Sequence, residues 1–200
     1  MAVERGHHRD LVVIGASAGG VQTLRQVVAE LPANLGAAVC VVLHVAPEGP
    51  SFLASILARA GPLPCRSAAD GDQLRVGEIL VAPPDHHLVI EDEHVKVTLG
   101  PRENGHRPSV DVLFRSAAAA AGGRVIGVVL SGTRDDGTAG LAVIKSRGGA
   151  TVVQDPNDAL YPGMPASALA HVAADAVVPA PEIAAAVIKL MDANDTERVA

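Results

Sequence analysis

The chain has 200 residues, of which 48% are hydrophobic, and it carries a formal net charge of −6 at pH 7. This length and hydrophobic content suffice for one domain with a substantial core. The acidic charge and the aromatic content of 2% predict no nucleic-acid binding, because phosphates require cationic side chains and bases stack on aromatic rings. The sequence has neither a signal peptide nor an apolar run that could span a bilayer. We therefore expect a cytoplasmic protein without membrane insertion.

The first predicted element is an apolar run that breaks into glycines. Residues 11–14 are continuously apolar and rich in β-branched side chains, which favours a strand buried on both faces of a parallel sheet. Apolar residues then recur at helical spacing over 21–31, so Gly15 and Gly19 mark a strand-to-helix turn around Ser17. Ser17 alone has two interpretations: an N-cap of the helix, or a nucleophile exposed on a tight turn.

Apolar segments alternate with helical patterns along the rest of the chain. Further strands are predicted at 37–43, 65–68, 124–130, 151–153 and 176–178, and further helices near 51–60, 109–117, 138–145, 165–172 and 182–191. This alternation predicts an α/β fold with a doubly wound, mostly parallel sheet and helices on both faces. Three short strands at 79–82, 88–90 and 95–99 have connections that fit antiparallel neighbours. They predict an inserted β-hairpin or three-stranded meander at about 77–100.

The cysteines and histidines indicate neither a disulfide nor a metal site. Cys40 lies in an apolar run and Cys65 follows a proline, without the spacing of metal ligands, so two reduced thiols are expected. The histidines at 7, 8, 86, 87 and 94 are too scattered for a ligand set. The sequence therefore predicts no cofactor and no metal.

Three polar residues fall directly after predicted strands. Ser17, His44 and Asp136 all lie just past a carboxyl end, at the edge of an open α/β sheet where ligands bind. Taken alone, His44 fits a satisfied, partly buried histidine, and Asp136 fits the N-cap of the helix that follows it. Together they are the parts of an acyl-transfer site, in which the imidazole relays the serine proton and the carboxylate orients the imidazole.

The segments that carry these residues resemble a known family. Residues 15–20, 42–44 and 130–140 look like the three catalytic motifs of the CheB family, the protein-glutamate methylesterases of bacterial chemotaxis. The likeness extends to 79–83, 106–111 and 154–166, and covers nearly the whole chain from Leu11 to about Met191. The resemblance implies that Ser17 is the nucleophile, His44 the general base and acid, and Asp136 the residue that orients His44.

The resemblance also implies a substrate and a partner. The substrate would be a glutamate γ-methyl ester on the cytoplasmic helices of a methylated chemoreceptor, or on a related signalling protein, with glutamine deamidation as a second activity. Ester hydrolysis passes through an oxyanion that needs N–H donors. The turn at Ala18 and Gly19 and the loop around Thr133 and Arg134 are the candidates.

Two departures from the family pattern affect this interpretation. The first strand begins at residue 11, so we expect a single catalytic domain at 11–191 without a receiver domain. A short polar arm would precede it at 1–10, and a polar tail would follow at 192–200. Where the family commonly has Gly-Met-Gly, this chain has Gly132-Thr133-Arg134. Arg134 brings bulk and positive charge next to the site, where it could alter the oxyanion wall or help to hold an acidic surface.

Two alternatives from other functional classes stay open at this point. One is a catalytically idle, receptor-binding scaffold, which the unusual Arg134 makes conceivable. The other is a phosphate- or nucleotide-binding module, because a glycine-rich turn between strand and helix also cradles phosphates. Against the second, Ser17 occupies a glycine position of the dinucleotide pattern, and His44 stands where a ribose-binding acid is expected.

Overall fold

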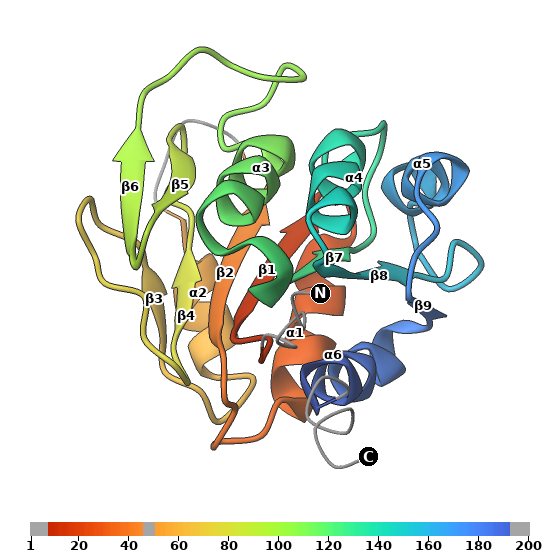
Figure 1. Ribbon diagram of the computed structural model, residues 1–200, viewed down its shortest axis with the longest axis horizontal. Helices are drawn as coiled ribbons and strands as arrows, with labels where there is room; N and C mark the ends of the chain where they lie inside the picture. Colours follow the sequence, from red (N-terminus) through yellow and green to blue (C-terminus); the bar gives the residue numbers. More distant parts are fainter. Residues whose placement is uncertain (1–7, 46–50, 193–200) are drawn as a thin grey trace, which may run out of the picture.

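A parallel sheet forms the centre of the computed structural model, which describes residues 8–45 and 51–192 (Figure 1). Its strand order is β3-β4-β2-β1-β7-β8-β9, and all neighbouring strands pair in parallel. The strands are β1 Leu11–Ala16, β2 Ala38–Leu43, β3 Cys65–Ser67, β4 Ile79–Val81, β7 Val125–Val129, β8 Ala150–Gln154 and β9 Ala176–Val178. The predicted α/β class with a mostly parallel sheet is confirmed.

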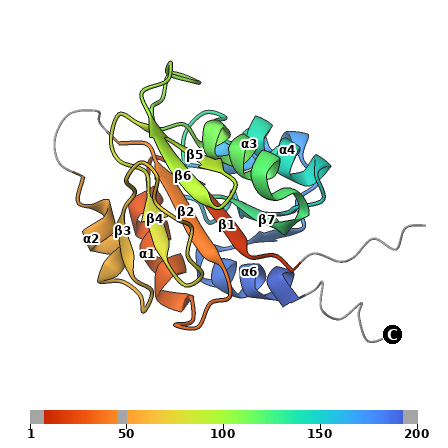
Figure 2. The same ribbon diagram turned by 60° about the vertical axis from the view of Figure 1, so that its left-hand side comes forward.

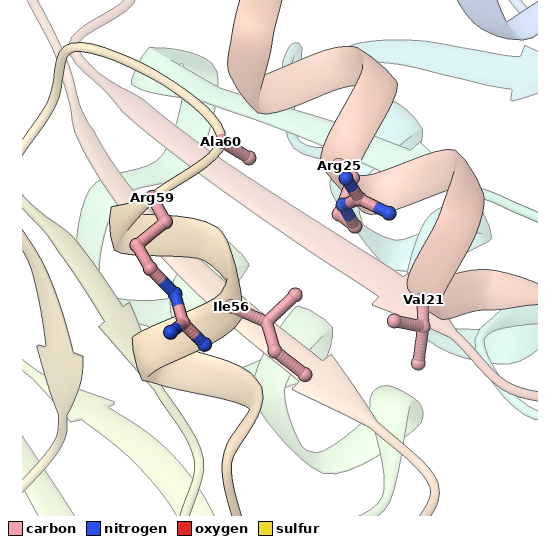
Figure 3. Close-up of a pocket in the computed structure, with 5 residues that line it drawn as sticks. All are labelled: Val21, Arg25, Ile56, Arg59 and Ala60. Atoms are coloured by element: carbon pink, nitrogen blue, oxygen red, sulfur yellow. The ribbon is translucent and has the colours of Figure 1, made fainter.

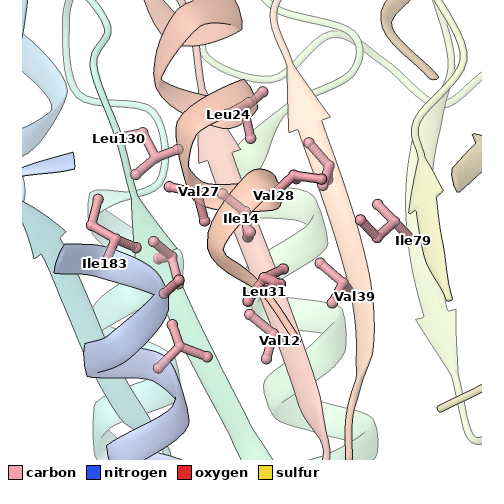
Figure 4. Close-up of a cluster of buried hydrophobic side chains, with 14 of the residues drawn as sticks. Val12, Ile14, Leu24, Val27, Val28, Leu31, Val39, Ile79, Leu130 and Ile183 are labelled. Atoms are coloured by element: carbon pink, nitrogen blue, oxygen red, sulfur yellow. The ribbon is translucent and has the colours of Figure 1, made fainter. Parts of the chain in front are cut away.

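Helices cover both faces of this sheet (Figure 2). The helices are α1 Gly20–Glu30, α2 Leu53–Ala58, α3 Val110–Ala121, α4 Thr138–Ser146, α5 Gly163–His171 and α6 Ile183–Asp192, with short 3-10 turns η1 Gly122–Arg124 and η2 Ala180–Glu182. Helices α1, α2 and α6 share one apolar cluster, whereas α3, α4 and α5 share the other. Successive residues of β1 alternate between the clusters, and Figure 4 shows Val12 and Ile14 facing α1 and α6. Because both faces of the sheet are buried, the sequences of its strands are nearly continuous runs of apolar residues.

The predicted antiparallel insertion is a hairpin of two strands. Strands β5 His87–Glu91 and β6 His94–Thr98 pair antiparallel, and their apolar face packs in the same cluster as α3. The prediction that residues 79–82 pair antiparallel with this insertion was wrong, because β4 lies in the main sheet between β2 and β3. The three residues of β4 are all buried, which requires cover on both faces. The short connection after β4 therefore leaves the sheet instead of reversing beside it.

Other element boundaries differ from the prediction by a few residues. Helix α5 starts two residues before the predicted 165, and β8 extends one residue beyond each predicted end. Most of the predicted arm, 1–7, and of the predicted tail, 193–200, lies outside the described residues, as does residue 50 near the start of the predicted second helix. In the described part of the chain, every helix is too short or too polar to cross a membrane.

The strand order places a topological switch point at β1. Strand β1 is central, with β2 on one side and β7 on the other. The chain leaves β1 towards α1 on one face and leaves β7 towards α4 on the opposite face. The carboxyl ends of the strands at such a switch point are the usual ligand site of open α/β sheets.

Candidate active site

Ser17 lies on a tight turn directly after the central strand. Its N–H donates to the Ser131 carbonyl at 2.9 Å, which ties the turn to the loop after β7. The N-cap of α1 is Gly19, whose φ of 75° lies in the left-handed region, and no side chain caps this helix. The N-cap interpretation of Ser17 is therefore wrong, and its hydroxyl is available for another partner.

His44 bridges Ser17 and Asp136. Its Nδ1 lies 3.0 Å from the Ser17 Oγ, and its Nε2 lies 2.7 Å from Oδ2 of Asp136. The side chains of His44 and Asp136 are only 7% and 1% exposed. Since an ionised carboxylate only accepts hydrogen bonds, the proton of the neutral imidazole belongs on Nε2, which leaves Nδ1 to accept the serine hydroxyl proton. The three strand-end residues thus meet in one hydrogen-bonded chain.

Asp136 accepts more hydrogen bonds than the one from His44. The backbone N–H groups of Val110 and Asp111 donate to it at 2.8 and 3.0 Å, and the Ser109 hydroxyl donates at 2.9 Å. Burial alone would raise the pKa of Asp136, but the hydrogen bonds, with that from His44 the strongest, hold it well below its usual range. Its carboxylate therefore stays ionised beside the imidazole.

Helices α3 and α4 cap each other through two aspartates. Asp136, which precedes α4, accepts the first N–H groups of α3. Asp111, in the first turn of α3, accepts the N–H groups of Gly137 and Gly140 at the start of α4. The alternative that Asp136 caps the helix that follows it is thus wrong, because the N-cap of α4 is Gly137 and this helix has no side-chain cap of its own. Each helix instead receives a negative charge at its positive end from the other.

The loop before α3 supplies residues that sequence reasoning did not assign to the site. The Asn104 amide donates to Asp111 at 2.8 Å and to Asp136 at 2.9 Å, and so bridges the two carboxylates. The His106 ring stacks on His44, with centroids 3.6 Å apart and planes 5° from parallel. Burial is the main cause that lowers the pKa of His106. A neutral ring therefore covers one face of His44 and restricts its rotation.

Candidate oxyanion donors surround Ser17. Among the described residues, no acceptor is found for the N–H groups of Ala18, Gly19, Thr133 and Arg134. The Ala18 carbonyl is fixed by the Ser131 hydroxyl at 2.8 Å, which orients the peptide units of the turn. Arg134 adopts a φ of 65°, a left-handed conformation that an arginine rarely takes. The structure brings both predicted segments next to Ser17, and their role in holding an oxyanion stays a prediction.

Gly132, in the loop after β7, lies against Ser17. A methyl group added there would lie 2.8 Å from the Ser17 Cβ and 2.1 Å from the Met164 sulfur. Both contacts are too short, so Gly132→Ala is expected to displace the turn by a few tenths of an ångström or more. We expect kcat to fall by about 10²-fold, as for other misplaced catalytic groups, and stability to fall by about 1–3 kcal/mol. Steady-state hydrolysis and thermal unfolding measure the two effects.

Gly36→Ala is the matched control for this prediction. A methyl group there would meet nothing closer than 3.6 Å, an ordinary contact, and Gly36 lies outside the site. Equal activity of the two alanine variants would show that the close approach of Gly132 does not position Ser17.

No metal site accompanies the cluster in the part of the chain that the structure describes: it holds no group of three His, Cys, Asp or Glu side chains that could bind an ion. Cys40 and Cys65 are free thiols, as predicted. Burial raises the pKa of each to about 12, and the charge of Glu78 adds to the rise. Protonated thiols are weak nucleophiles.

Comparisons with known proteins identify relatives over nearly the whole chain. The family described as CheB methylesterase matches residues 12–187. A protein-glutamate methylesterase/protein-glutamine glutaminase of Methanosarcina acetivorans is 37% identical, over 92% of this chain and 54% of that protein. A putative protein of the same name from Leptospira interrogans is 36% identical, over 94% of this chain and 98% of that protein.

A solved structure agrees with these relatives. The Thermotoga maritima CheB methylesterase catalytic domain superposes with a TM-score of 0.84 and 33% identity, over 90% of this chain and 98% of that one. The chain spans about half the length of the first curated relatives that it matches. With the family match, the relatives and the fold in agreement, the chain belongs to the CheB methylesterase family.

Proposed function

We propose that the chain hydrolyses glutamate γ-methyl esters on a protein, releasing glutamate and methanol, with Ser17 as nucleophile, His44 as general base and acid, and Asp136 as the orienting carboxylate. The observation that carries the proposal is the His44 ring, which lies 3.0 Å from the serine oxygen and 2.7 Å from the carboxylate at once. An idle scaffold would have no need of this buried, fully hydrogen-bonded arrangement. The names of the relatives support the same reaction.

In the first half-reaction the Ser17 oxygen attacks the ester carbonyl carbon while its proton moves to Nδ1 of His44. The oxyanion that forms would lie among the N–H groups of Ala18, Gly19, Thr133 and Arg134. When the tetrahedral intermediate collapses, the bond to the methoxy oxygen breaks and His44 returns the proton to it, which yields methanol. The ionised Asp136 stabilises the imidazolium that exists between these two proton transfers.

In the second half-reaction water attacks the glutamyl-serine ester. His44 takes one proton from the water, and collapse of the new intermediate returns that proton to the Ser17 oxygen. Glutamate is released and the resting state is restored. With a glutamine substrate the same steps expel ammonia in place of methanol, which would account for the second activity in the relatives' names.

The family suggests the cytoplasmic helices of a methylated chemoreceptor as substrate, with a related signalling protein as the alternative partner. The positive charge of Arg134 beside the site supports a substrate with carboxylates near the ester. A receptor's cytoplasmic part would place the reaction in the cytoplasm.

The decisive experiment measures methanol released from a methylated receptor cytoplasmic fragment. A fluorophosphonate probe that labels activated serines is applied in parallel to the same preparation. We expect methanol release, labelling of Ser17, and loss of release after labelling. If Ser17 were labelled but no methanol were released from any methylated receptor, the protein would still be a serine hydrolase, but the proposed substrate would be refuted. Release that survives complete labelling of Ser17 would refute the proposed nucleophile.

A further inference from the structure

Exposed apolar side chains flank Ser17 on the side of β8. Leu160 and Tyr161 are 74% and 43% exposed and lie in the loop between β8 and α5. They touch the serine turn, since a methyl group on Gly19 would come within 3.1 Å of Leu160 and 3.2 Å of Tyr161. The Tyr161 carbonyl accepts the N–H of Gly132 at 2.9 Å, so this loop is anchored to the site.

A groove lies on the opposite side, between α1 and α2 (Figure 3). Helix α1 starts three residues after Ser17, and Val21 in its first turn lines the groove, so this end of the groove lies near the carboxyl edge that carries the triad. It has a volume of about 360 Å³ and is lined by Val21, Arg25, Ile56, Arg59 and Ala60. In Figure 3 Ile56 points from α2 towards α1, and together with Val21 and Ala60 it forms the apolar floor of the groove. Phe52, at the start of α2, is 65% exposed.

The groove carries two cations in a chain whose formal net charge is −6. Arg25 donates to the Gln22 side chain and Arg59 to the Ser55 carbonyl, so both guanidinium groups contact neutral acceptors. Among the described residues neither arginine forms an ion pair. Exposed cations beside an apolar floor are suited to a partner that combines carboxylates with apolar side chains.

We propose that a docking face, made of Val21, Arg25, Phe52, Arg59, Leu160 and Tyr161, receives an acidic amphipathic helix of the substrate protein. This inference rests on the proposed function, because it names how the ester-bearing protein reaches Ser17. The apolar stripe of the helix packs on the groove floor and on an apolar rim made of Phe52, Leu160 and Tyr161. Its carboxylates meet Arg25 and Arg59, and the esterified glutamate points down to Ser17 between them.

The chemistry of the substrate argues for this occupant. A protein with several modifiable glutamates presents free carboxylates next to each ester, and an acidic enzyme would repel them without local cations. A groove between two helices commonly binds a third helix, which packs through residues spaced three and four apart. Four of the seven exposed large hydrophobic residues of the described chain lie on this face, which marks a contact surface and not scattered exposure.

Charge reversal tests the inference. Methanol release from a methylated receptor cytoplasmic fragment is measured for Arg25→Glu, Arg59→Glu and the matched control Arg75→Glu, an exposed arginine that precedes β4 at the opposite edge. We expect KM to rise about 3- to 10-fold for each groove variant at low salt. The difference from the control should largely vanish near 1 M salt, where the Debye length is about 3 Å.

A second pair of variants tests the apolar rim. Phe52→Ser and Val76→Ser replace side chains that are each 65% exposed, and only the first should raise KM. The fluorophosphonate labelling rate of Ser17 reports whether a variant has kept its site. The docking face would be overturned if the Arg25, Arg59 and Phe52 variants had the KM of their controls. It would also be overturned if their loss of methanol release only matched their loss of Ser17 labelling. Neither result would affect the proposed esterase activity. Wild-type protein that labels but releases no methanol would overturn both.

Discussion

Replacing Ser17 with alanine is expected to lower kcat for methanol release by about 10⁶-fold. The variant keeps the backbone bond from residue 17 to the Ser131 carbonyl and loses only the hydroxyl that His44 contacts at 3.0 Å. That hydroxyl caps no helix, so the melting temperature should stay close to that of the wild type. Methanol release and thermal unfolding measure the two quantities.

Ser146→Ala is a matched control for this substitution. Its exposed hydroxyl donates to the Val143 carbonyl in α4, far along the chain from the site, and its removal should leave methanol release unchanged. If Ser17→Ala retained even a hundredth of the wild-type rate, another group would have to be the nucleophile.

Asp136→Asn is expected to lower kcat by about 10⁴-fold and the free energy of unfolding by about 3–5 kcal/mol. An asparagine amide is neutral, and its NH₂ group replaces a carboxylate oxygen that accepts hydrogen bonds. This NH₂ group would face partners that are themselves donors. The amide keeps one oxygen. Either Ser109 and the Asp111 N–H, which bond Oδ1, or the Val110 N–H and His44, which bond Oδ2, would therefore lose their acceptor in a buried place. The imidazole would also lose the carboxylate that fixes its tautomer. Hydrolysis and urea unfolding, compared with the exposed neighbour variant Asp135→Asn, measure both losses.

The same variant should change the acid dependence of stability. Because the folded-state pKa of Asp136 is depressed, its contribution is fully present above the unfolded value of about 3.9 and is lost as pH falls towards the folded value. Burial raises the pKa of Asp111, so Asp111 acts with the opposite sign and offsets part of this loss. Below pH 4 we expect a flatter unfolding curve for Asp136→Asn than for wild type or Asp135→Asn. Parallel curves would contradict the depressed pKa.

The sequence predicted those parts of the site that follow from strand ends. Ser17, His44 and Asp136 each stand directly after a buried run, and parallel pairing brings such positions to one edge. Asn104 and His106 escaped assignment because Asp136 and His44, which they contact in the site, lie far along the chain. An asparagine followed by glycine also looks like an ordinary turn. The position of β4 was predicted wrongly because a short connection indicates antiparallel pairing only when both strands belong to one sheet. Whether the chain leaves the sheet after β4 depends on packing that no local pattern encodes.

The exchange of aspartates between α3 and α4 ties enzymatic competence to the cohesion of the two helices. Asp136 keeps its orientation only while the first N–H groups of α3 donate to it. Asp111 in turn accepts the N–H groups at the start of α4. Separation of this pair would strip the imidazole of its anionic partner before the central strands come apart. Inactivation on heating should therefore precede loss of the sheet, and a fragment that lacks either helix would be inert even if its serine and histidine were correctly folded.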